Sequence, residues 1–298
     1  MSQPLTLHPE RLFPADPATR AIAARLYAAV AELPIISPHG HTDPAWFATD
    51  APFANPTELL LAPDHYVFRM LYSQGLDLDA LGVPSRAGPS QADPRAAWRL
   101  FAQHFRLFRG TPSAYWLNHT FATVFGLDRR LDAASADHYY DTIDAALKTP
   151  ALRPRRLFER FRIEVLATTE SPTDPLAHHA AIRASGWPGR VITAYRPDPV
   201  VDPEHELFPV EVARFGELAG EDVASWTGYL AAHRKRRAYF AAHGATSTDH
   251  GHPSAATADL APAEAARLYA RVRSGGATPA EAELFRAQML TEMARMSL

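Results

Sequence analysis

The sequence predicts an α/β fold of the (β/α)8-barrel type, of which it carries about the first four βα units. After Pro154, short apolar runs alternate with segments of helical spacing, as in a parallel sheet with crossover helices. Between about residues 45 and 154, aromatic residues mix with Pro and Asp without a strand pattern, which indicates a large helical insertion after the first strand. A closed barrel of this type has eight strands, so we expect this one to be incomplete at its C-terminus.

The N-terminal region, residues 1–44, is expected to hold one helix and the first barrel strand. Residues 17–32 are amphipathic, because four apolar residues recur at helical spacing: Ile22, Leu26, Ala29 and Val30. Pro34 ends this helix, and Leu33–Ile36 is an apolar run suited to a buried strand. The insertion is expected over residues 45–154 as a helical subdomain.

The third region, residues 155–298, is expected to hold barrel units two to four. Strands are predicted at Arg162–Thr168, Arg190–Ala194 and Ala245–Thr248. Helices are predicted between them, at Asp174–Ala184 and 221–243. A helix at Pro262–Arg273 ends before Gly275. The last helix begins after Thr278, with Glu281 at the position of a capping box.

The composition excludes several classes of protein. The chain has 298 residues, 47% hydrophobic and 21% charged, and a formal net charge of −3, which gives no reason to expect nucleic acid or an anionic membrane as partner. It has no cysteine, so thiolate chemistry and disulfides are excluded. No secretory signal or membrane-spanning apolar run is recognisable, so a cytoplasmic location is the default expectation.

A His-Gly-His motif, His39-Gly40-His41, lies at the exit of the first predicted strand. Residues i and i+2 of a strand point to the same side, so two imidazoles can meet one divalent cation while Gly40 lets the backbone pass closely. Active sites of βα barrels lie at the carboxyl ends of the strands, which favours a metal site here. The alternative is a pair of loop histidines that bond nearby carbonyl groups.

The other strand ends are polar as well, which predicts one polar rim around the metal. Arg196 is suited to bind a substrate carboxylate, and Asp249 can move protons. The alternative for Arg196 is a structural ion pair with Asp198, and for Asp249 a helix cap or turn. Histidines 178, 179 and 233 are interpreted as exposed residues on helix faces.

Five segments, in chain order, resemble the uronate isomerase (glucuronate isomerase) family of the amidohydrolase superfamily of metal-dependent barrels. They are Pro34–His41, Asp64–Tyr66, Ala167–Asp174 continuing to His178 and His179, Tyr195–Asp198, and Phe240–Gly244 through Asp249 and His250. One such motif is unspecific, but five in order are specific. The family also has a large helical insertion after its first strand.

The resemblance implies an aldose–ketose isomerase of hexuronate catabolism. Its reactions are the interconversion of D-glucuronate with D-fructuronate and of D-galacturonate with D-tagaturonate. The implied cofactor is a divalent metal, with zinc expected and other metals open, and no organic cofactor. The implied site residues are, by role, His39 and His41 as metal ligands, Arg196 as ligand of the substrate carboxylate, and His65, Tyr66 and Asp249 as catalytic residues. For Tyr66 the alternative is a core aromatic residue.

The resemblance also implies that this is the N-terminal part of such a protein. The family barrel continues beyond this length, with a histidine after its fifth strand and an Asp-Ser-Arg-type segment after its eighth. We therefore expect the 298-residue chain alone to be inactive. Two alternatives stay open, a metal-dependent hydrolase of the same superfamily and a non-catalytic fragment or subunit. The expected partner is a small hexuronate; a homo-oligomer stays open.

Overall fold

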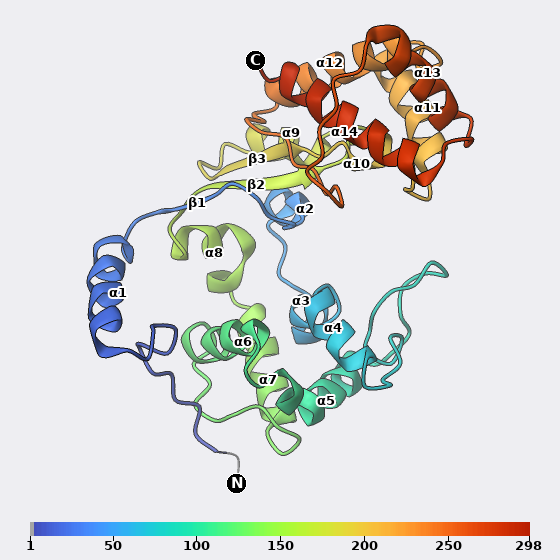
Figure 1. The fold of residues 1–298 in the computed structure, drawn as a ribbon. Helices are drawn as coiled ribbons and strands as arrows, with labels where there is room; N and C mark the ends of the chain where they lie inside the picture. Colours follow the sequence, from blue (N-terminus) through green and yellow to red (C-terminus); the bar gives the residue numbers. More distant parts are fainter. Residues whose placement is uncertain (1–2) are drawn as a thin grey trace. The chain divides into compact units, whose positions relative to one another are not determined.

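The computed structural model describes residues 3–298, which form two compact units (Figure 1). Among the described residues, the helical unit consists of 3–33 and Asp50–Arg160, and the sheet unit of Pro34–Thr49 and Phe161–Leu298. Each unit has its own buried apolar cluster. The division into three regions that the sequence predicts stays a prediction.

The helical unit is built on a core of aromatic and aliphatic side chains. Its helices are α1 (Pro17–Val30), α3 (Pro56–Leu60), α4 (His65–Tyr72), α5 (Pro94–His104), α6 (Pro112–Thr123), α7 (Ala136–Leu147) and α8 (Pro154–Arg160), with short 3₁₀ turns at Phe105–Phe108 and Pro150–Leu152. Trp98 is fully buried, and its indole nitrogen donates to the Ala136 carbonyl oxygen at 3.1 Å. This bond satisfies the one polar atom of a side chain that otherwise packs against rings.

The N-terminal helix differs from the others in this unit because none of its residues is buried. The amphipathic pattern correctly predicts the helix, and Asp16 caps it by accepting from the Thr19 backbone nitrogen. Its apolar residues Ile22, Leu26 and Val30 are nevertheless at least half exposed.

The sheet unit contains three parallel strands in the order β1 (Ile35–Ser37), β2 (Ile163–Glu170) and β3 (Arg190–Tyr195). Glu170 pairs with Tyr195, so β2 and β3 end side by side. Ser37 pairs with Leu166, so β1 ends four residues before the end of β2, and the chain after it runs on past the remainder of that strand. The predicted α/β class with a parallel sheet is confirmed. The arrangement as an eight-stranded barrel stays a prediction.

Two details of the predicted strands are wrong. The predicted fourth strand is reduced to one bridge, in which Thr248 pairs in parallel with Tyr195 and the Asp249 backbone nitrogen donates to the Tyr195 oxygen at 3.0 Å. The first strand is not buried, since Ile35 and Ile36 are 49% and 63% exposed. Within residues 3–298, β1 has β2 as its single neighbour, and an edge strand keeps one side open to solvent.

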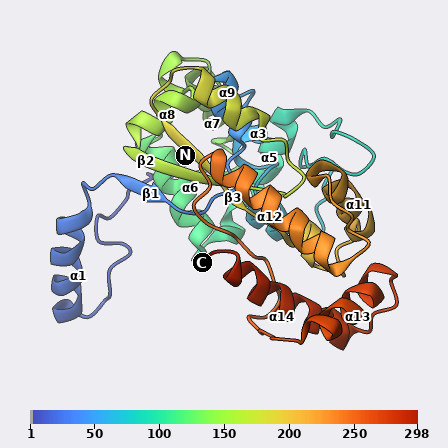
Figure 2. The same cartoon turned by 90° about the horizontal axis from the view of Figure 1, so that it is seen from above.

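Helices cover the sheet and build most of the second core. They are α2 (Pro44–Thr49), α9 (Ala177–Ala184), α10 (Asp198–Val201), α11 (Phe208–Ala219), α12 (Trp226–Ala242), α13 (Pro262–Arg273) and α14 (Pro279–Arg295). Both α9 and α12 pack on β3 (Figure 2). The predicted capping box is confirmed, because Thr278 and Glu281 bond each other's backbone at the start of α14. Among the described residues, no helix has the length and apolar character to cross a bilayer.

Candidate active site

Polar side chains gather where the strands of the sheet unit end. His39 and His41 follow β1, Thr169 lies at the end of β2, Arg196 follows β3, and Asp249 follows the bridge to Tyr195. Parallel strands end at the same edge, so residues distant in sequence become neighbours. The structure thus brings together four of the residues that the sequence predicts: His39, His41, Arg196 and Asp249.

The two histidines of the motif face each other. Their Nε2 atoms lie 3.2 Å apart and their ring planes meet at 84°. The Nδ1 atom of His39 lies 3.1 Å from Oδ2 of Asp249. The Nδ1 atom of His41 lies 3.2 Å from Oγ1 of Thr169, whose own hydrogen points to the Gly40 carbonyl oxygen at 3.3 Å.

These contacts favour one arrangement of the protons on the two rings. Thr169 uses its hydrogen toward Gly40, so it accepts from Nδ1 of His41. The Asp249 carboxylate is an acceptor only, so it favours a proton on Nδ1 of His39. Each ring then keeps its proton on Nδ1 and turns the lone pair of Nε2 toward the other ring. Two lone pairs at this distance repel unless a cation or a proton lies between them.

This donor set fits a divalent metal. Two nitrogen ligands at about 2.0–2.1 Å from one tetrahedral ion are about 3.3 Å apart, close to the distance found here. Metal-binding histidines also commonly donate their second nitrogen to a carboxylate or another oxygen, as Asp249 and Thr169 allow. Within residues 3–298, however, no three His, Asp or Glu side chains are grouped to hold a metal together. His39 and His41 can supply two ligands of such a site.

Arg196 is held by two carboxylates. Its Nε donates to Oδ2 of Asp198 at 2.7 Å, and its Nη1 donates to Oδ2 of Asp249 at 3.1 Å. The ion pair with Asp198, which the sequence leaves as an alternative, therefore exists. It does not occupy the whole guanidinium group, because Nη2 forms no hydrogen bond to any described residue. A rigid arginine with a free edge is suited to bind a carboxylate.

Gly251 allows this arrangement. Its backbone nitrogen donates to Oδ1 of Asp198 at 2.9 Å. A Cβ atom at this position would lie 2.6 Å from Nη2 of Arg196 and 2.7 Å from Oδ2 of Asp198. A larger residue would therefore displace the arginine. This role could not be predicted from the sequence, because no local pattern around Gly251 indicates the approach of Arg196 and Asp198.

A polar cavity of about 430 Å³ adjoins His41. It is lined by His41, Thr42, Asp43, Pro44, Thr169, Glu170, Ser171, Asp174 and His178. Its size suits a small polar ligand, and the lining supplies carboxylates and hydroxyl groups that can bond to one.

Glu170 lies at the border of this cavity and belongs to a buried polar cluster. Oε2 of Glu170 accepts from the hydroxyl groups of Thr168 and Thr193. His179 lies on the other side of Thr168, with Nε2 at 2.9 Å from its hydroxyl oxygen. Burial raises the pKa of Glu170 and lowers that of His179 to about 4. Thr168 and Glu170 lie on the opposite face of β2 from Thr169, so this cluster supports the strand rather than the histidine pair.

The interpretation of two histidines as exposed residues is wrong. His179 is 3% exposed and His233 is fully buried. The Nδ1 atom of His233 lies 2.9 Å from the hydroxyl oxygen of Tyr195, and its ring packs against Phe215 and Tyr229. His178 is exposed, as the sequence predicts.

The other two predicted site residues, His65 and Tyr66, belong to the helical unit. They form the first turn of α4, which Asp64 caps by accepting from the Tyr66 and Val67 backbone nitrogens. Tyr66 is 70% exposed, so it is not a core residue, and its ring lies 4.2 Å from that of His65. Their roles in a site stay a prediction.

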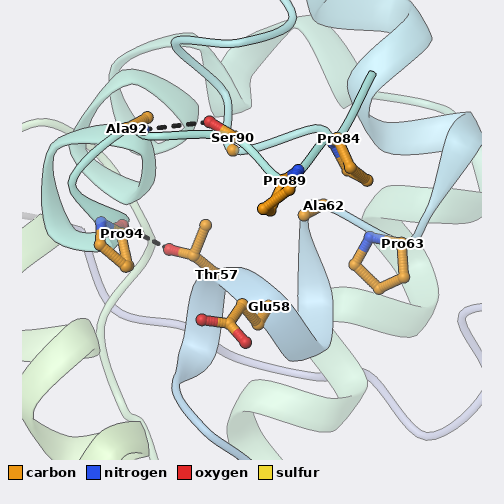
Figure 3. Close-up of a pocket in the computed structure, with 10 residues that line it drawn as sticks. Thr57, Glu58, Ala62, Pro63, Pro84, Pro89, Ser90, Ala92 and Pro94 are labelled. Carbon is orange, nitrogen blue, oxygen red and sulfur yellow. Dashed lines mark hydrogen bonds between the residues drawn. The ribbon is translucent and has the colours of Figure 1, made fainter. Parts of the chain in front are cut away.

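The helical unit has a cavity of its own, also of about 430 Å³ (Figure 3). Four prolines and two alanines line it, and its hydroxyl groups are engaged within the protein. Thr57 donates to the Pro94 carbonyl oxygen, and Ser90 donates to that of Asp79. Glu58 is its only titratable lining residue among those described. The strand-end cluster carries a richer set of groups for chemistry.

Comparison with known proteins gives a family for this fold and site. The model of the glucuronate isomerase family matches residues 17–298. A uronate isomerase from Xanthomonas axonopodis pv. citri is 74% identical over 298 residues, which are 100% of this chain and 63% of the relative. One from Phenylobacterium zucineum is 68% identical, again over the whole chain and over 62% of the relative.

Solved structures of two uronate isomerases also match this chain. A crystal structure of glucuronate isomerase from Caulobacter crescentus matches with a TM-score of 0.95 at 64% identity, covering 99% of this chain and 62% of that one. A uronate isomerase from Thermotoga maritima shares the fold, with a TM-score of 0.85 at 24% identity, over 98% of this chain and 62% of that one. The fold is that of an α/β protein with a parallel sheet and polar strand ends. The chain belongs to the glucuronate isomerase family. It spans somewhat less than two thirds of the length of these relatives.

Proposed function

We propose that the strand-end cluster serves the isomerisation of hexuronates. The substrates would be D-glucuronate and D-galacturonate, and the products D-fructuronate and D-tagaturonate. The observation that carries this proposal is that Asp249 contacts both His39 and Arg196. These contacts place a candidate metal ligand beside a group that can bind a carboxylate. Membership of the family supports it.

In this proposal Arg196 holds the carboxylate of the substrate. Asp198 holds its Nε and Asp249 holds its Nη1, so the side chain is already ordered before a substrate binds. Its Nη2 is left to donate to the substrate. A preorganised cation binds an anion at a lower entropic cost than a mobile one. This feature distinguishes uronates from neutral aldoses.

The reacting end of the open-chain sugar would lie toward His39 and His41. A divalent cation, zinc by preference, supplies polarisation of the carbonyl and hydroxyl oxygens when it is bound. Asp249 would accept and return protons, since its Oδ1 makes no hydrogen bond within residues 3–298. The isomerisation removes the proton on C2 and delivers one to C1 through an enediol. Tyr66 and His65 are proposed as further catalytic residues on the resemblance of their segment alone.

The test is a direct assay, with added Zn²⁺, of the chain completed by the part of the Xanthomonas axonopodis relative that it does not cover, because the 298 residues alone are expected to be inactive. This completed chain is used for every kinetic measurement. D-Glucuronate and D-galacturonate are offered in turn, and the ketose product is measured. Neutral D-glucose serves as the matched control, since it lacks the carboxylate that Arg196 would bind. Conversion of the two uronates and not of glucose supports the proposal.

Two results would contradict it. Equal conversion of glucose and glucuronate would mean that Arg196 does not select the carboxylate. Hydrolysis of a panel of esters and amides without isomerisation would favour a metal-dependent hydrolase, which a site with two histidines at a strand end also suits.

A further inference from the structure

A side chain continues the attachment of the His-Gly-His segment to β2 after the backbone ladder ends. The ladder between β1 and β2 ends where Ser37 pairs with Leu166. Beyond that point the chain still lies close to β2, because a Cβ atom on Gly40 would lie 3.4 Å from a carbonyl oxygen of that strand. Further along β2, the Thr169 hydroxyl oxygen lies 3.3 Å from the Gly40 carbonyl oxygen and 3.2 Å from Nδ1 of His41.

Thr169 occupies a well-fixed position on β2. It pairs with Ala194 of β3 in the parallel ladder. Its two neighbours, Thr168 and Glu170, point to the other face of the strand and are bonded to each other in the buried polar cluster. Threonine is branched at Cβ, which restricts rotation about χ1. The hydroxyl group is therefore held by the sheet rather than by the segment that it contacts.

The hydroxyl group of Thr169 has one hydrogen and two neighbours. The Gly40 carbonyl oxygen can only accept a hydrogen bond, so both contacts are bonds only when Thr169 donates to it and accepts from Nδ1 of His41. A neutral imidazole with its proton on Nδ1 has its lone pair on Nε2. This Nε2 atom is the one that lies 3.2 Å from Nε2 of His39.

We propose that Thr169 is a positioning residue that fixes the ring of His41 and keeps its proton on Nδ1, so that Nε2 is the ligand atom. Thr169 acts through His41, and the inference rests on the proposed function in taking His41 as a metal ligand. Removal of such an oxygen partner of a metal-binding histidine typically lowers metal affinity by about 10–100-fold. Loss of the Thr169 hydroxyl group should therefore weaken metal binding although both histidines remain.

Nitrogen NMR of isotope-labelled histidines tests the position of the ring proton. The sample is the metal-free chain, completed by the part of the Xanthomonas axonopodis relative that it does not cover, at a pH where the rings are neutral. The signals of His41 are those that disappear in H41Q. In the wild type the proton should be on Nδ1, whereas both forms should be populated in T169V, which keeps the shape but lacks the hydroxyl group. A wild-type His41 with its proton on Nε2 would overturn the proposal without recourse to any Thr169 variant.

Zinc titration of the same completed chain by calorimetry measures the consequence. The Kd for zinc should rise about tenfold in T169V, while T169S, which keeps the hydroxyl group, should restore an affinity close to that of the wild type. Thr42→Val is the matched control, because Thr42 lines the same cavity and its hydroxyl group forms no hydrogen bond to any described residue. This control should bind zinc like the wild type.

Two results of the titration would overturn the proposal: equal zinc affinity of T169V and the wild type, or a T169S chain as weak as T169V. The second result would mean that the shape of the side chain matters and its hydroxyl group does not. A chain that binds zinc as predicted but fails to isomerise uronates would contradict the proposed function alone, so the two failures are distinguishable.

Discussion

The Nε2 atoms of His39 and His41 lie 3.2 Å apart while each Nδ1 atom faces an oxygen atom. This arrangement connects the end of β1 to β2 through Thr169 and to the segment after β3 through Asp249. The histidine pair therefore depends on two side chains from distant places in the sequence, Thr169 and Asp249. A change at either of them should alter the site without removing one of the two histidines.

Replacing Arg196 by lysine should weaken uronate binding. Lysine keeps the charge but loses the planar fork that bonds Asp198 and Asp249 together. We expect KM for D-glucuronate to rise at least tenfold, which corresponds to the ~1.5–3 kcal/mol of a charged hydrogen bond. Steady-state kinetics of R196K measures this. An unchanged KM would mean that the carboxylate binds elsewhere.

Replacing Gly251 by alanine should displace Arg196, because the added Cβ atom would lie 2.6 Å from its Nη2. Both atoms that the Cβ atom approaches are ends of side chains, so the free energy of unfolding should change by less than about 1 kcal/mol, while uronate binding weakens because Arg196 moves. Gly276→Ala is the matched control, since its nearest atom beyond the chain neighbours is the Ser274 hydroxyl oxygen at 3.5 Å. The KM for D-glucuronate is measured for both variants, and an equal KM for the two would contradict the close approach.

The buried His179 should make the protein less stable in acid. Burial lowers its pKa to about 4, whereas the unfolded chain takes up the proton near its ordinary value of 6.5. The unfolded state therefore binds more protons between these pH values, so the stability that is complete above pH 6.5 is lost as the pH falls toward 4. The loss should be on the order of 3 kcal/mol.

Denaturation curves at several pH values check the His179 prediction. The variant H179Q should show a smaller loss over this window, and Glu170 titrates in both chains, so the comparison isolates the histidine. His138→Gln, at an exposed position on α7, should behave like the wild type. An identical slope for H179Q and the wild type would contradict the assignment.

Tyr66→Phe tests whether this tyrosine is catalytic. The side chain is 70% exposed, and its hydroxyl group forms no hydrogen bond to any residue of 3–298, so stability should change by less than about 0.5 kcal/mol. Isomerase turnover should fall at least tenfold. Tyr72→Phe, which changes another exposed tyrosine of α4, is the control and should alter neither quantity. A fully active Y66F chain would remove Tyr66 from the proposed mechanism.

Elements with strong local signals could be predicted from the sequence. The helix at Pro262–Arg273 matches its predicted bounds, and the capping box of Thr278 and Glu281 is present because it depends on residues three apart. The strands β2 and β3 follow from apolar runs bounded by polar residues. Features that depend on tertiary partners could not be predicted. Periodicity alone does not tell which face of α9 or α12 packs against the sheet, and so His179 was interpreted as exposed.

The candidate active site shows the same difference between features with a local signal and features that depend on tertiary partners. The positions of His39, Arg196 and Asp249 follow from one rule, that parallel strands end at the same edge. The ion pair of Arg196 with Asp198, two residues on, was among the alternatives predicted from the sequence. The contact of Arg196 with Asp249, the bond of Gly251 to Asp198 and the bond of Thr193 to Glu170 join residues 23 to 53 positions apart. No spacing in the sequence indicates such contacts.

The most direct test of the central claim follows D-glucuronate by proton NMR in D₂O with the zinc-supplemented completed chain, in which the Xanthomonas axonopodis relative supplies the part that residues 1–298 do not cover, and with its D249N variant. Asp249 joins the histidine pair to Arg196, so its amide variant keeps the shape but loses the charge that both contacts require. We predict that the wild type forms D-fructuronate with exchange of the C2 hydrogen for deuterium, and that D249N does so at least a hundredfold more slowly. Conversion at the wild-type rate by D249N, or no conversion by the wild type, would contradict the assignment of uronate isomerisation to this cluster.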